Sequence, residues 1–304
     1  MNSTLIYSAC ALICAALLAY TLTPLVRVLA IKIKAIDVPT DGRRMHHKPI
    51  PRIGGLAIFL AFLITSIGFC RLDRELVTIL IGGSALVLLG ILDDVYRLNA
   101  FLKLAVQIVA ALFAVSQGVT IDYICFFGKY VAFGNWAIPI TVFWIVGLTN
   151  AVNFIDGLDG LASSVCATVA AFTLLLAVWR RDADSTVLAA ALLAGMLGFL
   201  VFNHHPAQMF MGDTGSLFLG GVIMGCAMMA GELLLFVLAG FVFVADMLTS
   251  LLQRWYFRLT HGKRLFPIAP IHHSFEKWGF GEYAVMGLFA GVSALFCVLA
   301  WFGK

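Results

Sequence analysis

The chain has 304 residues, of which 62% are hydrophobic and 12% are charged, and its formal net charge is +4. Ordinary soluble domains carry about 25% charged residues, so this composition excludes a soluble globular protein. It indicates an integral membrane protein surrounded by membrane lipid, and we expect no nucleic-acid partner.

About ten apolar runs in this sequence are long enough to cross or nearly cross a bilayer, which takes about 20 helical residues. They lie near residues 5–28, 54–70, 76–92, 100–118, 136–152, 160–179, 186–202, 215–231, 233–253 and 283–302. We predict a single polytopic domain over residues 1–304, an all-α bundle of about ten transmembrane helices. The first run has no basic segment before it and no cleavage site, which indicates a retained helix rather than a signal peptide.

The first polar loop, residues 31–53, combines basic and imidazole side chains with prolines. Such cations suit phosphate binding, and Lys48 is the candidate contact. A loop that only fixes the orientation of the chain in the membrane is the alternative. Pro49, Pro51, Gly54 and Gly55 favour a shaped loop, because a purely orienting loop needs no turn residues.

Two adjacent carboxylates, Asp93 and Asp94, end the third apolar run. Adjacent carboxylates repel each other unless a cation lies beside them, and Mg²⁺ typically takes one or two carboxylates together with substrate phosphates. A solvated helix end is the alternative interpretation. Lys103 and Gln107 follow one helical turn apart, where they either point into the same cavity or snorkel towards water.

The densest polar stretch is residues 150–162, Asn-Ala-Val-Asn-Phe-Ile-Asp-Gly-Leu-Asp-Gly-Leu-Ala. It places Asn150, Asn153, Asp156 and Asp159 at near-helical spacing at the edge of an apolar run. Carboxylates are costly beside hydrocarbon, so they persist where they face water, a metal or a substrate. We therefore expect this stretch to belong to a functional site at one face of the membrane.

A third acidic cluster is Asp213 in the segment Phe210-Met-Gly-Asp-Thr-Gly-Ser216. The glycines on either side of Asp213 permit a close approach of the backbone to a ligand. Phe210 is either a ring that stacks on a nucleobase or an ordinary interfacial aromatic residue.

The longest polar loop, residues 254–282, contains the adjacent histidines His272 and His273. Adjacent histidines do not form the i, i+4 face of a helical zinc site. As neutral or charged donors they suit a pyrophosphate better.

Two further features are expected to serve structure. Residues 119–135 are rich in aromatic and β-branched residues and predict a short external hairpin. Asp246 lies deep in the ninth apolar run, where an acid is either a shielded contact to a neighbouring helix or part of a site. We interpret Asp246 as a structural contact.

The basic residues are distributed unevenly between alternate loops. One set of loops holds Arg27, Lys32, Lys34, Arg43, Arg44, Lys48, Arg52, Arg97, Lys103, Arg254, Arg258, Lys263, Arg264 and Lys277. The positive-inside rule places this set in the cytoplasm and both termini outside. All three acidic clusters fall on the same predicted cytoplasmic side.

Five motifs occur in order on that side: Pro51-Arg-Ile-Gly-Gly55, Asp93-Asp94, the stretch 150–162, Phe210-Met-Gly-Asp213 and Ala269-Pro-Ile-His-His-Ser-Phe-Glu276. Together they resemble the polyprenyl-phosphate N-acetylhexosamine-1-phosphate transferase superfamily, glycosyltransferase family 4. The resemblance implies a ten-helix bundle, often a homodimer, in the bacterial cytoplasmic membrane with a cytoplasmic Mg²⁺ site. It also implies transfer of a sugar-1-phosphate from a UDP-N-acetylhexosamine to undecaprenyl phosphate, with release of UMP.

The resemblance implies roles for single residues as well. Asp213 corresponds to the principal Mg²⁺ ligand, together with Asp94, and Asp93 and Asp94 correspond to the catalytic pair that acts with Asp213. Asn153, Asp156 and Asp159 are expected to bind the nucleotide, with Asp159 and Phe210 holding the uracil. Asn150, Gly157 and Leu158 of the same motif are expected to be substrate-binding residues. Phosphate and sugar-phosphate contacts are expected from Lys48, Arg97, His272 and His273. Asp93 either accepts the residual proton of the lipid phosphate or fixes the geometry.

The sub-branch is a choice between two donors. The first loop and the stretch 150–162 are similar to the enzymes that transfer GlcNAc-1-phosphate. The last loop instead resembles the branch that transfers phospho-N-acetylmuramoyl-pentapeptide and serves peptidoglycan synthesis, with Ser274 where that branch has its third histidine. Because the last loop is expected to touch the sugar, we favour UDP-MurNAc-pentapeptide as donor. UDP-GlcNAc, used for teichoic acid or polysaccharide, is the alternative.

Three functions of other classes are less consistent with the pattern. A cation-coupled transporter predicts acids near helix midpoints and inverted repeats, whereas the acids here lie at helix ends. A CDP-alcohol phosphotransferase is expected to have an arginine where this chain has Ser163 and Ser164. A non-catalytic scaffold gives no reason for so many acids at one interface.

Overall fold

The computed structural model describes residues 2–38, 49–126, 129–229 and 233–302, and Lys48 lies outside this part of the chain. The long helices are α1 (Asn2–Lys32), α2 (Gly55–Phe69), α3 (Arg74–Tyr96), α4 (Ala100–Ser116), α5 (Ala137–Ile155), α6 (Leu161–Arg180), α7 (Ala183–Asn203), α8 (Gly212–Met229), α10 (Phe241–Leu259) and α12 (Glu282–Phe302). Shorter elements are β1 (Ile36–Asp37), β2 (Ile50–Pro51), β3 (Tyr123–Phe126), β4 (Lys129–Ala132), the 3₁₀ turn η1 (Gly134–Trp136), α9 (Leu233–Ala239) and α11 (Ile271–Lys277).

Within the described residues, six segments are helical, long and apolar enough to span a membrane. They are Ile6–Lys32, Arg74–Tyr96, Gly134–Ile155, Leu161–Arg180, Ala183–Asn203 and Glu282–Phe302, and α2 and α4 are shorter apolar helices. The prediction of an all-α membrane protein is confirmed.

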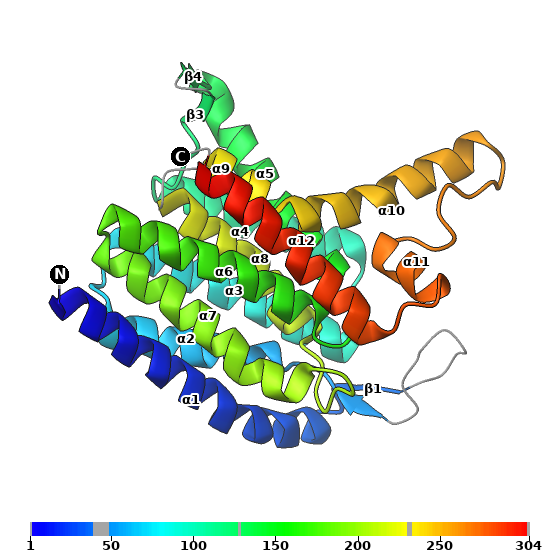
Figure 1. Ribbon diagram of the computed structural model, residues 1–304, viewed down its shortest axis with the longest axis horizontal. Helices are drawn as coiled ribbons and strands as arrows, with labels where there is room; N and C mark the ends of the chain where they lie inside the picture. The colour runs from blue at the N-terminus through cyan, green and yellow to red at the C-terminus, as the bar shows by residue number, and fades with distance from the viewer. Residues whose placement is uncertain (1, 39–48, 127–128, 230–232, 303–304) are drawn as a thin grey trace.

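Small residues let the helices of this bundle approach closely, as is common where helices pack in lipid. A Cβ added at Gly198 in α7 would lie 2.6 Å from the carbonyl oxygen of Ala16 in α1, and Figure 1 shows α1, α7 and α6 lying side by side. Glycines also bring the start of α8 against α2 and α3. A Cβ at Gly55 would lie 1.9 Å from Cα of Gly215, and one at Gly90 would lie 2.4 Å from Cα of Thr214.

The expectation of one continuous helix over residues 233–253 is wrong. The chain forms α9 and α10 with a break at Gly240, whose N–H still donates to the carbonyl of Phe236. Glycine has a low helix propensity, which makes a break there inexpensive. Beyond this break α10 projects from the bundle towards α11 (Figure 1).

Two short antiparallel strand pairs complete the fold. The pair β3–β4 confirms the hairpin predicted within residues 119–135. In the pair β1–β2, Ile36 lies opposite Pro51. After β2 the chain runs beside the segment that precedes α8, where the N–H groups of Gly54 and Gly55 donate to the carbonyls of Phe210 and Met211. α1 begins and α12 ends at one end of the bundle, whereas β1 and α11 lie at the opposite end (Figure 1). We call this opposite end the polar end.

Candidate active site

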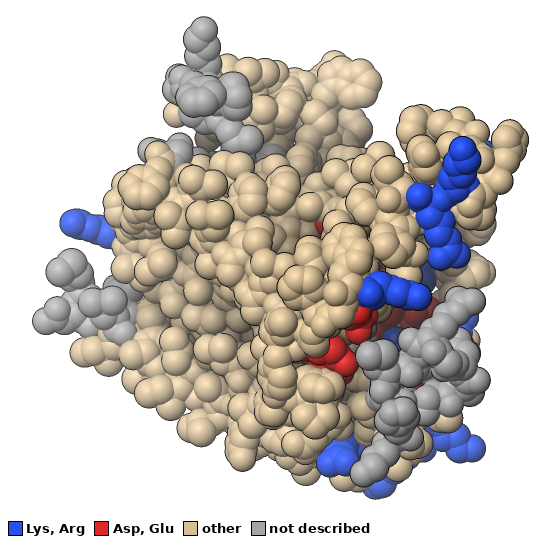
Figure 2. All heavy atoms as spheres, turned by 45° about the vertical axis from the view of Figure 1, so that its right-hand side comes forward, with Lys and Arg blue, Asp and Glu red and all other residues tan. Residues whose placement is uncertain are grey.

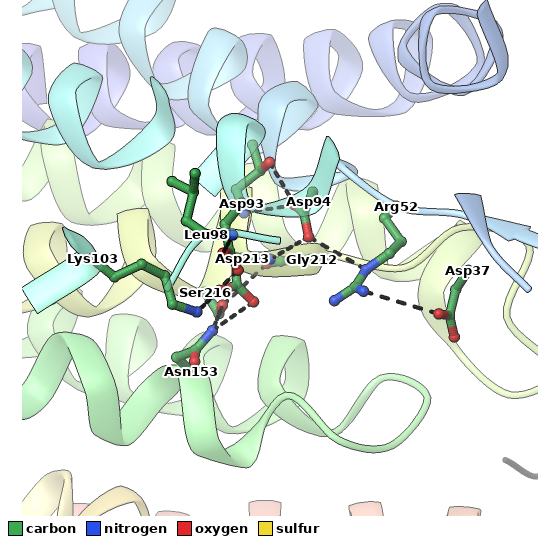
Figure 3. Close-up of polar contacts among 11 residues, drawn as sticks. Asp37, Arg52, Asp93, Asp94, Leu98, Lys103, Asn153, Gly212, Asp213 and Ser216 are labelled. Atoms are coloured by element: carbon green, nitrogen blue, oxygen red, sulfur yellow. Dashed lines mark hydrogen bonds and ion pairs between the residues drawn. The ribbon is translucent and has the colours of Figure 1, made fainter. Parts of the chain in front are cut away.

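The three acidic clusters predicted from the sequence meet at the polar end of the bundle. Asp93 and Asp94 come from the end of α3, Asp213 from the first turn of α8 and Asn153 from the last turn of α5. Figure 3 shows their side chains pointing towards one another. In Figure 2, Asp and Glu side chains lie in a hollow of this end, with Lys and Arg side chains around it. Segments about 60 and 120 residues apart therefore build one centre.

Asp94 holds the beginning of α8. Its carboxylate accepts hydrogen bonds from Asp213 N–H (3.1 Å), Thr214 N–H (3.0 Å) and Thr214 Oγ1 (2.8 Å). First-turn amides of a helix have no partner within the helix and carry its positive dipole end, so a carboxylate is favourable there. Gly212 lies directly beside it with φ +72°, where a Cβ would come within 2.4 Å of Asp94 Oδ2. Only glycine fits this approach.

Lys103 joins Asp93 to Asp213. Its Nζ lies 3.0 Å from Asp93 Oδ2 and 3.0 Å from Asp213 Oδ2, and Asp93 also accepts from Leu98 N–H at 2.8 Å. The sequence left two interpretations of Lys103 open. These contacts confirm the one in which its side chain points into the site rather than towards water. Its partner Gln107 lies one turn on and accepts a 2.6 Å hydrogen bond from Asn150 Nδ2.

Asn153 orients the other oxygen of Asp213. Its Nδ2 donates to Asp213 Oδ1 (3.0 Å) and to Ser216 Oγ (2.8 Å). Asp213 is thus held from both sides, by an amide on Oδ1 and an ammonium on Oδ2, which is the preorganisation that a ligand-binding carboxylate requires.

Arg52 supplies the second cation of the centre. Its Nε lies 3.3 Å from Asp94 Oδ1, and its Nη1 lies 4.0 Å from Asp37. Burial lowers the pKa of the Arg52 guanidinium, but the carboxylates of Asp94, Asp213 and Asp37 more than compensate, so the pKa rises above its ordinary value. Carboxylates nevertheless outnumber cations here, which favours the binding of a further cation.

Asp156 lies just beyond α5, and its side chain forms no ion pair with any residue that the structure describes. Burial, aided by the negative charges of Asp213, Asp94 and Asp159 and opposed by Arg52, raises the pKa of its carboxyl to about 7. A raised pKa marks a group that the fold tolerates poorly in its charged form, which is characteristic of functional sites.

This burial has a measurable consequence for stability. The unfolded carboxyl titrates near pH 4, so the folded state binds the extra proton between about pH 4 and pH 7 and loses stability as the pH rises through that window. We expect Asp156→Asn to be more stable than the wild type by about 2 kcal/mol at pH 8, after allowance for water access, and by less at pH 5.5. Melting temperatures measured at both pH values without divalent ions test this. A pH-independent difference would contradict it.

Asp159 is fixed by a separate network at the junction of α5, α7 and α12. Its Oδ2 accepts from Ala207 N–H (2.9 Å) and contacts His205 Nδ1 (2.9 Å), and Glu282 Oε2 lies 3.3 Å from the same histidine nitrogen. Among the described residues, these three side chains form the one group whose spacing could hold a metal ion. His205 contacts both Asp159 and Glu282, so these three side chains already pair with one another. We interpret the group as a network that positions the Asp159 side chain.

His272 and Asp246 form a buried pair that links α11 to α10. Both side chains are fully buried, with His272 Nδ1 2.9 Å from Asp246 Oδ2, and His272 N–H donates to Asp246 Oδ1 at 3.3 Å. With the Asp246 carboxylate as the acceptor in this contact, the ring proton of His272 is assigned to Nδ1. Nε2 is buried without a partner among the described residues and faces Gly157, where a Cβ would come within 2.5 Å of it. The predicted contact of Asp246 to a neighbouring element is confirmed, and this contact orients a candidate site residue.

We expect Asp246→Asn to lower kcat about 100-fold, because an amide at this position stabilises the wrong tautomer of the histidine. The KM for the donor and the melting temperature should change little. Asp246→Glu, which keeps the acceptor, should recover part of kcat. A loss of folded protein in both variants would instead assign Asp246 a purely structural role.

His273 and Ser274 extend this arrangement along α11. His273 Nδ1 lies 2.7 Å from Glu276 Oε2, and burial, reinforced by the neighbouring His272, lowers the pKa of His273 despite that carboxylate. Ser274 accepts from Ile268 N–H and donates to the carbonyl of Ile268. The serine at the third position of the histidine motif therefore closes the loop that precedes α11.

The remaining predicted residues lie around this centre. Gly157 packs against both His272 and His273, Leu158 is half-buried, and Phe210 is held by backbone bonds to Pro51 and Gly54. Arg97 ends α3 in a left-handed conformation and is exposed, with no side-chain bond to the described part of the chain. Sequence reasoning did not assign roles to Thr214, Ser216, Arg52 or the His205–Glu282 network. Only Arg52 gave a signal, as a charged residue inside a turn motif.

The carboxylate oxygens of this centre suit a hard divalent cation such as Mg²⁺. Asp213 is the best placed of them, since it is held on both oxygens by groups that can move aside, Lys103 and Asn153. Asp94 already accepts from three donors of α8 and contacts Arg52, so its predicted role as metal ligand stays a prediction.

Fold and site together define a polytopic α-helical membrane protein with a carboxylate-rich centre, held by Lys103 and Arg52, at one end of its bundle. Its sequence matches the model of glycosyl transferase family 4 over residues 76–231, a range that includes Asp93, Asp94, the stretch 150–162 and Asp213. The chain belongs to this family, as its resemblance to the superfamily predicted, and it is an enzyme, a membrane phosphotransferase.

Individual relatives carry two kinds of name. Phospho-N-acetylmuramoyl-pentapeptide-transferase of Caldicellulosiruptor bescii is 36% identical over 278 residues, covering 86% of this chain and 86% of that protein. The enzyme of the same name from Clostridioides difficile is 35% identical over 281 residues, covering 87% and 86%. The probable undecaprenyl-phosphate N-acetylglucosaminyl 1-phosphate transferase of Bacillus subtilis is 41% identical over 203 residues, covering 66% of this chain and 56% of that protein.

Proposed function

We propose that this protein transfers phospho-N-acetylmuramoyl-pentapeptide from its UDP-linked donor to undecaprenyl phosphate, releasing UMP, in the synthesis of peptidoglycan. The convergence of Asp93, Asp94 and Asp213 carries the proposal: Lys103 joins Asp93 to Asp213, and Asp94 accepts from the backbone N–H of Asp213. The similarity to relatives of that name over 86% of the chain supports the choice of donor.

The membrane arrangement belongs to the same proposal. The six long apolar helices together with α2, α4, α8 and the broken pair α9–α10 would make the ten crossings. The excess of basic residues in alternate loops supports a cytoplasmic site in the bacterial inner membrane with both termini outside. We further propose a homodimer.

A groove between α4 and α5 suits the prenyl chain of the acceptor. It has a volume of about 520 Å³ and is lined by Ile108, Leu112, Ile138, Pro139, Val142, Phe143, Val146, Gly147 and Asn150. Its lining is apolar except for Asn150, which lies one turn before Asn153 and hence beside the polar centre. An acceptor held there would place its phosphate next to Asp213.

In the proposed reaction, an oxygen of the lipid phosphate attacks the sugar-bearing phosphorus of the donor. A new P–O bond forms while the bond to the bridging oxygen breaks, and UMP leaves with that electron pair. Mg²⁺ bound at Asp213 would supply neutralisation of the charge that grows on the leaving phosphate. Lys103 and Arg52 add fixed positive charge. Asp93 already accepts from Leu98 and Lys103, which supports the positioning role for it over proton acceptance.

Transfer of GlcNAc-1-phosphate is the second candidate, favoured by the 41% identity to the Bacillus subtilis protein. The deciding experiment incubates purified protein with undecaprenyl phosphate, Mg²⁺ and either UDP-MurNAc-pentapeptide or UDP-GlcNAc, and reads the lipid-linked product by mass. We expect product with the first donor. Product with UDP-GlcNAc alone would overturn this choice, and product with neither would overturn the proposed reaction.

A further inference from the structure

A second groove begins beside the active site and runs outward along α10. It has a volume of about 510 Å³ and lies between Phe154 at the end of α5, the outer half of α10 and the segment that ends at Pro270. Phe154 directly follows Asn153, and Pro270 is followed by Ile271 and His272. The groove therefore opens where the candidate sugar-contacting histidine lies and leads away from Asp213.

Three arginines, Arg254, Arg258 and Arg264, line this groove, and no acidic residue of the described ranges does. We call it the arginine groove. Arg264 donates to the carbonyl of Pro267 at 3.2 Å, whereas Arg254 and Arg258 have no side-chain hydrogen bond or ion pair to the described residues and are exposed. These two stand one helical turn apart on the same face, where like charges repel each other. An anion between them would remove that repulsion.

The wall of the arginine groove is held in place. Gln253 Oε1 accepts from the N–H groups of Leu265 and Phe266, both at 2.9 Å, and its Nε2 donates to the carbonyl of Phe266 at 3.0 Å. This amide ties the segment after α10 back onto the helix. The groove is thus formed before a ligand arrives, which lowers the entropic cost of binding.

Ser250 gives an independent indication of a polar ligand. Its side chain lines the groove one turn before Arg254 and is only 5% exposed. Its Oγ is buried without a hydrogen-bond partner in the described part of the chain. Buried hydroxyls are usually hydrogen-bonded, so a polar ligand group at this end of the groove would satisfy the Ser250 hydroxyl.

We propose that the arginine groove binds the carboxylates of the peptide carried by the donor. The inference rests on the proposed function, because a donor with a pentapeptide ends in at least one free carboxylate, whereas UDP-GlcNAc carries no peptide. Arginine pairs with carboxylates through two parallel hydrogen bonds, and Phe154, Phe257 and Pro270 offer apolar contacts to peptide side chains. The proposed function assigns the apolar groove between α4 and α5 to the prenyl chain, which leaves the arginine groove to the donor.

The test is the double variant Arg254→Gln/Arg258→Gln, assayed with UDP-MurNAc-pentapeptide and with UDP-MurNAc that lacks the peptide. We expect the KM for the pentapeptide donor to rise about 10-fold or more, since two charge-assisted contacts are lost. The KM for the peptide-free donor, the KM for undecaprenyl phosphate and the melting temperature should stay at wild-type values. Arg27→Gln, an exposed arginine of α1, is the matched control and should change none of them.

Other outcomes separate the possible sources of the anion. A higher KM for undecaprenyl phosphate would overturn the proposal and assign the arginines to the lipid headgroup. An equal rise for both donors would overturn it in favour of a general charge effect. If the wild type uses the pentapeptide donor and the double variant behaves like the wild type, only the groove proposal fails. If the wild type does not use that donor, the proposed function fails as well.

Discussion

Replacement of Asp213 by alanine is expected to abolish turnover, with a loss of at least about 10³-fold in kcat. Asp213 is the one carboxylate that Lys103 and Asn153 hold from both sides, and it lies at the positive end of α8. Asp94, by contrast, is already occupied by three donors of α8 and by Arg52. The variant should also lose the rise in melting temperature that Mg²⁺ produces in the wild type, and a chelator should abolish wild-type activity.

A matched control separates this loss from a general effect of removing an acid. Asp122, which is exposed beside the β3–β4 hairpin at a distance from the polar end, should tolerate replacement by alanine with full activity. Wild-type activity in Asp213→Ala would refute the metal assignment. Loss of activity together with an unchanged response to Mg²⁺ would place the metal elsewhere, and Asp94 would then become the first candidate.

The convergence of the acids was predictable because each marks the end of an apolar run. Asp94, Asp156 and Asp213 close or open helices that cross the same layer, and charged groups collect where such helices leave hydrocarbon. Once the helices are assigned, predicting whether the acids meet requires only deciding on which of the two membrane faces each helix end lies. The hairpin of residues 119–135 was predictable for a similar reason, since its β-branched and aromatic residues form a local pattern.

The sequence did not predict which atoms of each residue form structural hydrogen bonds and which are available to a ligand. The sequence cannot distinguish a carboxylate that binds a metal from one that caps a helix, and Asp94 proves to be occupied by the amides of α8. The structural contact expected of Asp246 is confirmed, but the sequence does not indicate that its partner is His272 of α11, 26 residues later. The break at Gly240 was missed since hydropathy continues unchanged through it.

Gly90 has no functional side chain, yet it determines how closely α3 and α8 approach each other at the site. Gly90→Ala is expected to lower activity about 100-fold. The glycine lies one turn before Asp94 on the same face of α3, and a Cβ there would lie 2.4 Å from Thr214 N and 2.5 Å from the carbonyl carbon of Asp213. These are backbone atoms, so the contact is relieved only by moving α8 away from α3. The hydrogen bonds from Thr214 to Asp94 would then lengthen, and a displacement of about 1 Å can cost 10²-fold in rate.

The same substitution should lower stability by about 1–3 kcal/mol, as overpacking usually does, which a melting experiment measures. Gly82→Ala is the matched control, because Gly82 lies in the same helix and an added Cβ would meet no atom within 4 Å. That variant should be fully active and slightly more stable, since alanine favours helix more than glycine does. Equal activity of the two variants would mean that α3 and α8 can separate without disturbing Asp213, and that the cap of α8 by Asp94 does not control the reaction.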